Sequence, residues 1–429
     1  MVVSMTNEEK PLYILLAIIV VFFAAAGLLH EGPGSALRGL VAIQSHTGRL
    51  ISDFTLIGGI GAAFLNASLM GAIALVIINI TDVSLSGPTI AAFFTIVGFS
   101  LFGKTPLNTA PIMIGVYLVG RIIRKPFNNY ILIALYGTAL GPLTAYLAIA
   151  AGFSGIPALL IGTAGGLIAG FLLPALAMAM LRLHEGYNLY NIGLTCGFFG
   201  LFAASILQAS GLDVDIKIIW NQEPSILLQG LVPALSILLI VWGLAMDGIK
   251  KSFQGLIDIQ KLTGRLPSDF MTMTSPGSTL LNAGLLGLAG CLYIFVVGGD
   301  FNGPSIGGLF TLIGFATFGK HGRNTWPVAA GVIAATLLFG KSLSDPGPLL
   351  ALLFGTTLAP LAGEFGSRIG FIAGFLHLVV VERTAAWHGG LDLYNNGFAG
   401  GLVATFMLAI IEWYRSNVLE KKPKKRNKS

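Results

Sequence analysis

Few residues of this sequence have side chains that could bind or react with a solute, and most of these residues occur in two similar segments. Gly87-Pro88-Thr89 opens one apolar segment, and Gly303-Pro304-Ser305 opens another with the same plan. Because proline at the first helical position fixes φ and has no N–H group, both sequences predict a helix that begins after irregular backbone. The free N–H groups at Thr89 and Ser305 could then hold an anion or a carbonyl oxygen, unless these are ordinary turns at the surface.

Amide and phenol side chains form a second repeated set. Asn66 and Asn282 lie within apolar segments, where an amide must find partners and could either link helices or line a pore. The others lie close to the start of an apolar segment, where they could bind a polar solute or, for tyrosine, anchor the chain at the membrane surface. These further candidates for solute binding are Asn108, Asn324, Tyr190, Asn191, Tyr394 and Asn395.

His377 lies inside an apolar segment and has no histidine counterpart, because the equivalent residue in the other half is Leu173. Ionisable groups within membrane segments are rare and functional by default. His377 is therefore a candidate for proton coupling or substrate binding. A structural histidine bonded to a backbone carbonyl is the alternative.

The remaining charged residues indicate no catalysis. Arg49 and Asp53, like Arg265 and Asp269, are four residues apart and are expected to pair on one helix face in a structural role. No HExxH motif or carboxylate cluster occurs, so neither a metal nor another cofactor is expected. Residues 98–105 match the phosphate-loop pattern, but they end an apolar segment and follow no strand, which argues against nucleotide hydrolysis. An enzyme is not predicted.

The elements that must position these residues are membrane segments. Of the 429 residues, 55% are hydrophobic and only 10% are charged, with a mean hydropathy of +0.83. A soluble domain has roughly 25% charged residues, so a soluble enzyme and a disordered protein are both excluded. Apolar stretches of 19 to 27 residues predict an all-α polytopic protein whose main partner is the lipid bilayer. Six of the Lys and Arg residues lie in the last nine positions, so the basic pI does not indicate nucleic acid.

An internal duplication organises the chain. Residues 43–116 align with 259–332 at an offset of 216, and later motifs align at offsets of 218 and 204. We expect a first repeat over 1–210, an extracytoplasmic connector over 211–225, a second repeat over 226–413 and a basic cytoplasmic tail over 414–429. Each repeat has about seven apolar elements, and the third is short or broken. In the first repeat these elements lie near 11–29, 54–79, 87–103, 109–122, 128–151, 155–181 and 189–210.

The two repeats are expected to have inverted topology. Seven crossings per repeat is an odd number, which turns the second repeat upside down relative to the first. If the N-terminus is cytoplasmic, most of the 25 Lys and Arg residues fall in loops on the inside, as the positive-inside rule requires. This assignment counts Lys320 as an inside charge and Lys104 as an outside charge. It also places the C-terminus in the cytoplasm.

Over nearly its whole length, with doubled Thr-Gly-Arg, Phe-Gly-Lys and Tyr-Asn motifs, the chain resembles a family of duplicated prokaryotic integral-membrane proteins of unknown function. The resemblance implies a prokaryotic inner membrane and no particular activity. Leu-Tyr-Asn-x-Gly at 189–193 and 393–397 is similar to a turn in urea transporters, although their Leu-Pro-x-x-Thr motif is absent. Seven plus seven elements resemble the nucleobase and sulfate transporters, but 226–246 and 305–318 lack the carboxylate those families often carry.

Together these features predict a secondary transporter of a small polar or anionic solute. The solute would bind near the membrane midplane, around Thr89, Ser305, Asn66 and Asn282, between the two repeats. A passive channel of the urea-channel kind and a membrane scaffold without transport are the alternatives. A homo-oligomer is compatible with the sequence.

Overall fold

The computed structural model describes residues 9–419, and within that range the regular secondary structure is all helical, without strands. An isolated bridge joins Ser52 to Ile219. The prediction of an all-α protein is confirmed. Most of the predicted basic tail, from residue 420 onward, lies outside the described residues, as do residues 1–8.

The first half contains ten α-helices, with short 3-10 turns at Phe127–Tyr130 (η1) and Thr138–Leu140 (η2) around α7. The α-helices are α1 (Lys10–Glu31), α2 (Pro33–Gln44), α3 (Phe54–Ile57), α4 (Ile60–Ile80), α5 (Gly87–Phe99), α6 (Pro106–Ile122), α7 (Ile131–Gly137), α8 (Gly141–Ile149), α9 (Gly155–His184) and α10 (Asn191–Ala209).

The second half repeats this order, with η3 (Thr356–Leu358) between α17 and α18 and a terminal turn η4 (Arg415–Leu419). Its α-helices are α11 (Ile226–Asp247), α12 (Ile249–Ile259), α13 (Phe270–Met273), α14 (Pro276–Val297), α15 (Gly303–Phe315), α16 (Gly322–Leu338), α17 (Pro346–Gly355), α18 (Ala359–Phe365), α19 (Ser367–Trp387) and α20 (Asn395–Tyr414).

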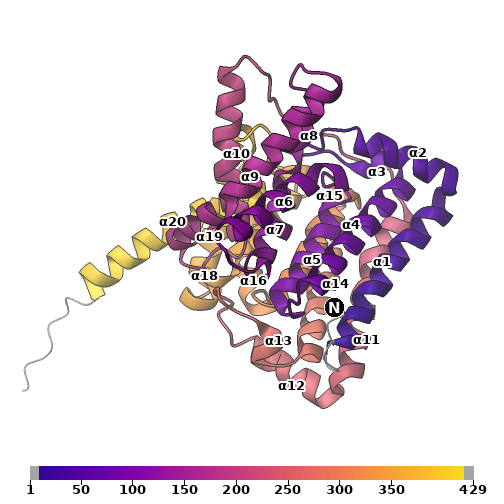
Figure 1. Cartoon of the computed structure of the whole chain (residues 1–429). Coiled ribbons are helices and arrows are strands. Elements are labelled where there is room, and N and C mark those ends of the chain that lie inside the picture. The colour runs from indigo at the N-terminus through magenta and orange to yellow at the C-terminus, as the bar shows by residue number, and fades with distance from the viewer. Residues whose placement is uncertain (1–8, 420–429) are drawn as a thin grey trace, which may run out of the picture.

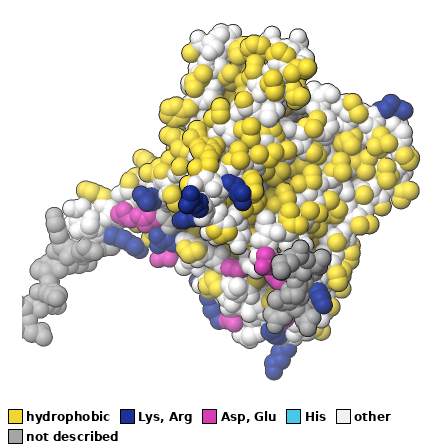
Figure 2. All heavy atoms as spheres, viewed as in Figure 1, with side chains coloured by type: hydrophobic (Ala, Val, Ile, Leu, Met, Phe, Trp, Pro, Cys, Tyr) yellow, Lys and Arg dark blue, Asp and Glu magenta, His cyan; other side chains and the backbone are white. Residues whose placement is uncertain are grey.

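The surface and the helix lengths are those of a multi-pass membrane protein. Within the described residues, ten helical segments are long and apolar enough to cross a membrane. The predicted third elements, α5 and α15, have 13 residues each and are indeed short. Figure 2 shows hydrophobic side chains over most of one face, with charged side chains gathered toward its lower edge. Such a broad apolar surface is typical of lipid contact.

Two features of the fold differ from the sequence-based expectation. Helices α2 and α12 were not among the predicted apolar elements, because each is short and amphipathic and packs on the following long helix. Residues 45–53 and 261–269 form no helix, so the expected Arg49–Asp53 and Arg265–Asp269 pairs do not form. Arg49 lies over the ring of Tyr146 instead.

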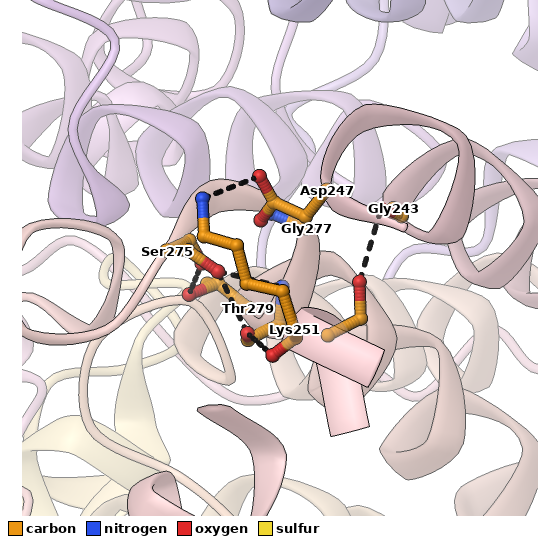
Figure 3. A network of polar contacts seen from close by, with 8 residues as sticks. Gly243, Asp247, Lys251, Ser275, Gly277 and Thr279 are labelled. Carbon is orange, nitrogen blue, oxygen red and sulfur yellow. Dashed lines mark hydrogen bonds and ion pairs between the residues drawn. The ribbon is translucent and has the colours of Figure 1, made fainter. Parts of the chain in front are cut away.

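Figure 3 shows how the bend between α11 and α12 is fixed against α14. Asp247 accepts a hydrogen bond from the Gly277 N–H at 2.7 Å and forms an ion pair with Lys251 at 3.1 Å. Ser275 accepts a hydrogen bond from Thr279 through its main-chain oxygen, at 2.8 Å. Because the carboxylate satisfies a free N–H in the first turn of α14, the polar contacts here hold the helices at a fixed angle.

Equivalent helices of the two halves meet at the centre of the molecule. Helices α5 and α15 are antiparallel, since Gly87 lies against Thr317 at one end and Gly98 against Gly307 nearer the other. Helices α10 and α20 cross near their first residues, where Gly193 and Gly397 touch. In Figure 1, α10 points to the top and α20 to the lower left, while α2 and its counterpart α12 lie at opposite ends of the molecule.

Candidate functional site

A cavity of about 640 Å³ lies at this centre, between the two halves. Its walls come from α5, α7, α9 and α10 of the first half and from α15, α17 and α20 of the second. Its size is that of ordinary small-molecule sites, and most of its lining is apolar or aromatic. The polar side chains on its inner wall belong to Thr95, Tyr136, Tyr190, Asn191, Thr311, Tyr394 and Asn396.

The lining of the cavity reaches exposed residues at one end of the structure. Its rim contains the exposed residues Arg182 and Glu185 and the half-buried Ser268. The counterpart of Ser268 in the first half is Ser52, which is only 2% exposed. The counterpart of Glu185 is the buried Gly389, against which Val214 of the connector packs.

The connector closes that second end through backbone contacts. Ile219 donates its N–H to the Ile51 oxygen at 3.0 Å and accepts from the Asp53 N–H at 3.1 Å. Tyr146 donates its hydroxyl to the Asp213 carbonyl oxygen at 2.6 Å. The segment that joins the two halves therefore also covers the end of the molecule opposite the open mouth.

Two buried lysines lie behind the tyrosines of the cavity wall. Lys104 follows α5 and donates from Nζ to the Tyr394 hydroxyl oxygen at 2.5 Å. Lys320 follows α15 and donates to the Tyr190 hydroxyl oxygen, also at 2.5 Å. Both lysines are 0% exposed, and neither belongs to an ion pair among the described residues. Each pair joins one half to the other.

Aromatic rings complete the surroundings of each ammonium group. Lys104 lies 4.5 Å from the centre of the Tyr394 ring, which packs edge-on against Phe99 with centroids 4.6 Å apart. Lys320 lies 4.6 Å from the centre of the Tyr190 ring, which packs in the same way against Phe315 at 4.4 Å. Contact with ring faces stabilises a cation that has lost its water.

Three of the predicted binding residues line the cavity, namely Tyr190, Asn191 and Tyr394. Asn191 Oδ1 also accepts a hydrogen bond from His184 Nε2 at 3.0 Å, and Asn191 Nδ2 donates to the Ala177 carbonyl oxygen. These residues come together because α10 and α20 begin at the same depth in the protein. The repeated Tyr-Asn motif was the sequence signal that found them.

Thr89 and Ser305 are buried at the first turns of α5 and α15 and do not line the cavity, although the neighbouring Pro88 does. Thr89 Oγ1 is bonded to Ser86, and Ser305 forms a capping box with Asn302. The helix N-termini are occupied by carboxylates from the opposite halves. Asp269 accepts from the Gly87 N–H at 3.1 Å, and Asp53 accepts from the Gly303 N–H at 3.3 Å.

The four internal asparagines act between helix ends in this structure. Asn66 donates to the carbonyl oxygens of Ser100 and Lys104, both at 2.7 Å, and Asn282 makes the same two contacts after α15. Asn108 and Asn324 form capping boxes at the starts of α6 and α16. Asn66 and Asn282 were expected either to link helices or to line a pore. Their contacts in the structure link helices.

His377 and Asn395 lie behind the cavity wall. His377 is 0% exposed and pairs through Nε2 with the Asn396 side-chain oxygen at 3.0 Å, and Asn396 lines the cavity. Asn395 bonds to His388 and to Thr384. Among the described residues, no three His, Cys, Asp or Glu side chains gather in a way that could hold a metal ion.

Sequence reasoning missed Lys104 and Lys320 because it treated them as loop charges. Because both lysines are buried, one basic residue is removed from the inside count and one from the outside count. The excess of Lys and Arg in the inside loops therefore remains. The signal was present, since a lysine directly follows each short apolar segment at the same offset of 216. What local sequence could not indicate was a tyrosine partner 290 residues away.

The fold and the central cavity define a multi-pass helical membrane protein with a duplicated plan. The chain belongs to the family described as "Protein of unknown function (DUF1576)", whose model matches residues 33–209 and 249–413. One matched segment falls in each half, which confirms the resemblance to an uncharacterised duplicated family. No curated protein and no solved structure matches the chain.

Proposed function

We propose that this protein is a secondary transporter that works by alternating access, with its solute bound in the central cavity. The observation that carries the proposal is the difference between two equivalent ends of the molecule. Ser268 is only half-buried at the cavity rim, whereas Ser52, at the same position in the first half, is 2% exposed. Two related halves in different conformations are what one state of an alternating-access carrier requires.

The predicted inverted topology agrees with this proposal. The antiparallel packing of α5 on α15 and the positions of α2 and α12 at opposite ends are what an inverted pair would give. The exchange of conformations between the halves would then turn an inward-open cavity into an outward-open one. On the predicted topology, the mouth at Arg182 faces the cytoplasm of a prokaryotic cell and the connector faces outside.

The cavity chemistry favours a small solute with an apolar body and an acceptor-bearing, anionic end. Phe99, Phe315 and Phe354 provide apolar walls. The hydroxyl oxygens of Tyr190 and Tyr394 accept hydrogen bonds from ammonium groups, which strengthens their own O–H groups as donors. When Lys104 and Lys320 are protonated, their charges behind the wall also favour a negative group in the cavity.

A passive channel remains the alternative, and a scaffold without transport is the third class. A channel would need a continuous path, whereas the connector covers one end of this cavity. The one-sided opening therefore favours the carrier.

Binding can be tested with four probes that share one ring: benzenesulfonate, benzoate, benzamide and benzylammonium. A ligand that binds only the folded state raises the melting temperature as its concentration increases. We expect the two anions to stabilise the detergent-purified protein and benzylammonium to have no effect. Equal stabilisation by the cation, or no stabilisation by any probe, would contradict the proposed site.

Alternating access can be tested with two matched cysteines, Ser268→Cys and Ser52→Cys, after replacement of the buried Cys196 and Cys291. A membrane-impermeant maleimide should label Ser268→Cys readily and Ser52→Cys slowly. Addition of benzenesulfonate should change the two labelling rates in opposite directions. In a channel with a fixed pore, the ratio of the two rates would stay the same.

A further inference from the structure

The two halves differ at one buried position next to the cavity, where Asn188 of the first half corresponds to Asp392 of the second. Both side chains are 0% exposed and lie two residues before a cavity tyrosine. Each accepts a hydrogen bond from the N–H of that tyrosine, at 3.2 Å for Asn188 and 2.9 Å for Asp392. The local backbone is thus the same, and only the side-chain chemistry has changed.

The amide in the first half is fully paired. Asn188 Oδ1 also accepts from the Thr357 hydroxyl at 2.5 Å, and its Nδ2 donates to the Gly397 carbonyl oxygen at 3.1 Å. Beside Asp392 the place of Thr357 is taken by its first-half equivalent at the offset of 218, Ala139, which has no hydroxyl. Asp392 Oδ2 is accordingly buried without a hydrogen-bond partner.

The titratable groups around Asp392 come from each element that packs against it. Lys104, after α5, and Cys196, on α10, interact with it electrostatically, as does Tyr394 at the start of α20. His388, at the end of α19, accepts a hydrogen bond from the Asp392 N–H at 3.4 Å. Lys104 is the cation of this group, and its ammonium is bonded to the Tyr394 hydroxyl oxygen instead of to the carboxylate.

In such a buried place, an ionised carboxylate with an unpaired oxygen is strongly disfavoured relative to the protonated acid. If Asp392 releases its proton, the new negative charge competes with Tyr394 for the Lys104 ammonium. Because the Tyr394 ring forms part of the cavity wall, loss of the Lys104 contact would change the wall that the solute touches. The carboxyl group, the lysine and the tyrosine could then exchange between two arrangements beside the cavity.

We infer that Asp392 Oδ2 is a proton-binding site that couples proton movement to solute transport. The inference rests on the proposed function, since it assigns the coupling ion of the same cavity. The proton binds reversibly to the carboxylate and leaves by the same bond, so no other reactant takes part. The first half has no such site because Asn188 cannot ionise.

Protonation of Asp392 can be measured without any solute by infrared spectroscopy of the full-length protein. At neutral pH the wild type should show the carbonyl stretching band of a protonated carboxylic acid. Asp392→Asn should lose this band, and so should Asp392→Asn combined with Ala139→Thr, which is designed to copy the Asn188–Thr357 pair and preserve the fold. Asp300→Asn, a control at a carboxylate bonded to Trp220, should retain the band.

The inference is overturned if the wild type lacks the band or if both Asp392 variants keep it. Coupling is then measured in vesicles that contain a trapped pH dye, with benzenesulfonate as probe because its sulfonate stays ionised. Benzenesulfonate uptake should acidify wild-type vesicles and leave the pH of Asp392→Asn vesicles at the protein-free level. Uptake without acidification in the wild type would overturn coupling. If no uptake occurs, the proposed function fails on this probe, and the infrared result still decides whether Asp392 holds a proton.

Discussion

Lys104 and Lys320 show how this protein accommodates a buried lysine that has no ion-pair partner among the described residues. Each ammonium has one tyrosine hydroxyl oxygen at 2.5 Å and two aromatic rings around it, and neither has a carboxylate in an ion pair among the described residues. Hydrogen bonds to charged groups contribute about 1.5–3 kcal/mol, roughly twice the contribution of neutral ones. The two tyrosines are therefore important for stability as well as for the cavity.

We predict that Tyr394→Phe lowers the free energy of unfolding by about 1–3 kcal/mol, because it leaves the Lys104 ammonium unpaired. The double variant Tyr394→Phe/Lys104→Met should recover most of this loss, since removal of both partners leaves no unsatisfied charge. Melting temperatures in detergent provide the measurement. Tyr136→Phe is the matched control, because its hydroxyl donates to the neutral Pro88 carbonyl oxygen at 3.2 Å and should cost less.

At the scale of elements, glycines set the distance between neighbouring long helices. Helix α9 lies so close to α6 that a Cβ at Gly170 would meet the Ile112 carbonyl oxygen at 2.0 Å. The equivalent contact in the second half lies between Gly374 of α19 and Val328 of α16, at 1.9 Å. Small residues at such faces permit backbones to approach, which is how membrane helices gain packing contacts.

Gly374→Ala should therefore destabilise the protein by about 1–3 kcal/mol, because the added methyl group forces α16 and α19 apart. Gly230→Ala is the control, since Gly230 lies within α11 with nothing within 4 Å of its added Cβ. That change should be neutral or stabilise the helix by up to about 1 kcal/mol. Thermal unfolding of both variants in one detergent would test the contrast, and similar melting temperatures would refute it.

At the scale of the whole molecule, each half completes the other. Asp53 of the first half accepts from the Gly303 N–H of the second, and Asp269 accepts from Gly87 in the reverse direction. The buried Lys–Tyr pairs also run between halves. A half alone would leave a charged lysine and the first turn of a short helix without partners, at a cost of several kcal/mol.

A chain divided between Ile216 and Lys217, in the exposed part of the connector, should assemble from its two pieces. We expect co-expressed pieces to purify together, and residues 1–216 alone to be degraded or to aggregate. Size-exclusion chromatography against the intact chain in the same detergent provides the comparison. A stable, monodisperse single half would show that the contacts between halves are dispensable.

The sequence by itself determined the helical class, the duplication and the short α5 and α15. These features depend on local apolar length and on Gly-Pro starts, so each can be recognised within a few turns of chain. It also identified Tyr190 and Tyr394, because the repeat marks them twice. Asn66 and Asn282 were found as polar residues in apolar segments, although their role as links needed the contacts of the folded chain.

Only the tertiary structure decided which residues became partners and where the cavity lies. Lys104 and Tyr394 are 290 residues apart, and Asp53 and Gly303 are 250 apart, so no local pattern relates them. Asp392 Oδ2 likewise has no hydrogen-bond partner because Ala139, which lies far away in the sequence, has no hydroxyl group. Burial and hydrogen-bond pairing are properties of the packed chain, whereas hydrophobicity and repeat spacing are properties of the chain before it packs.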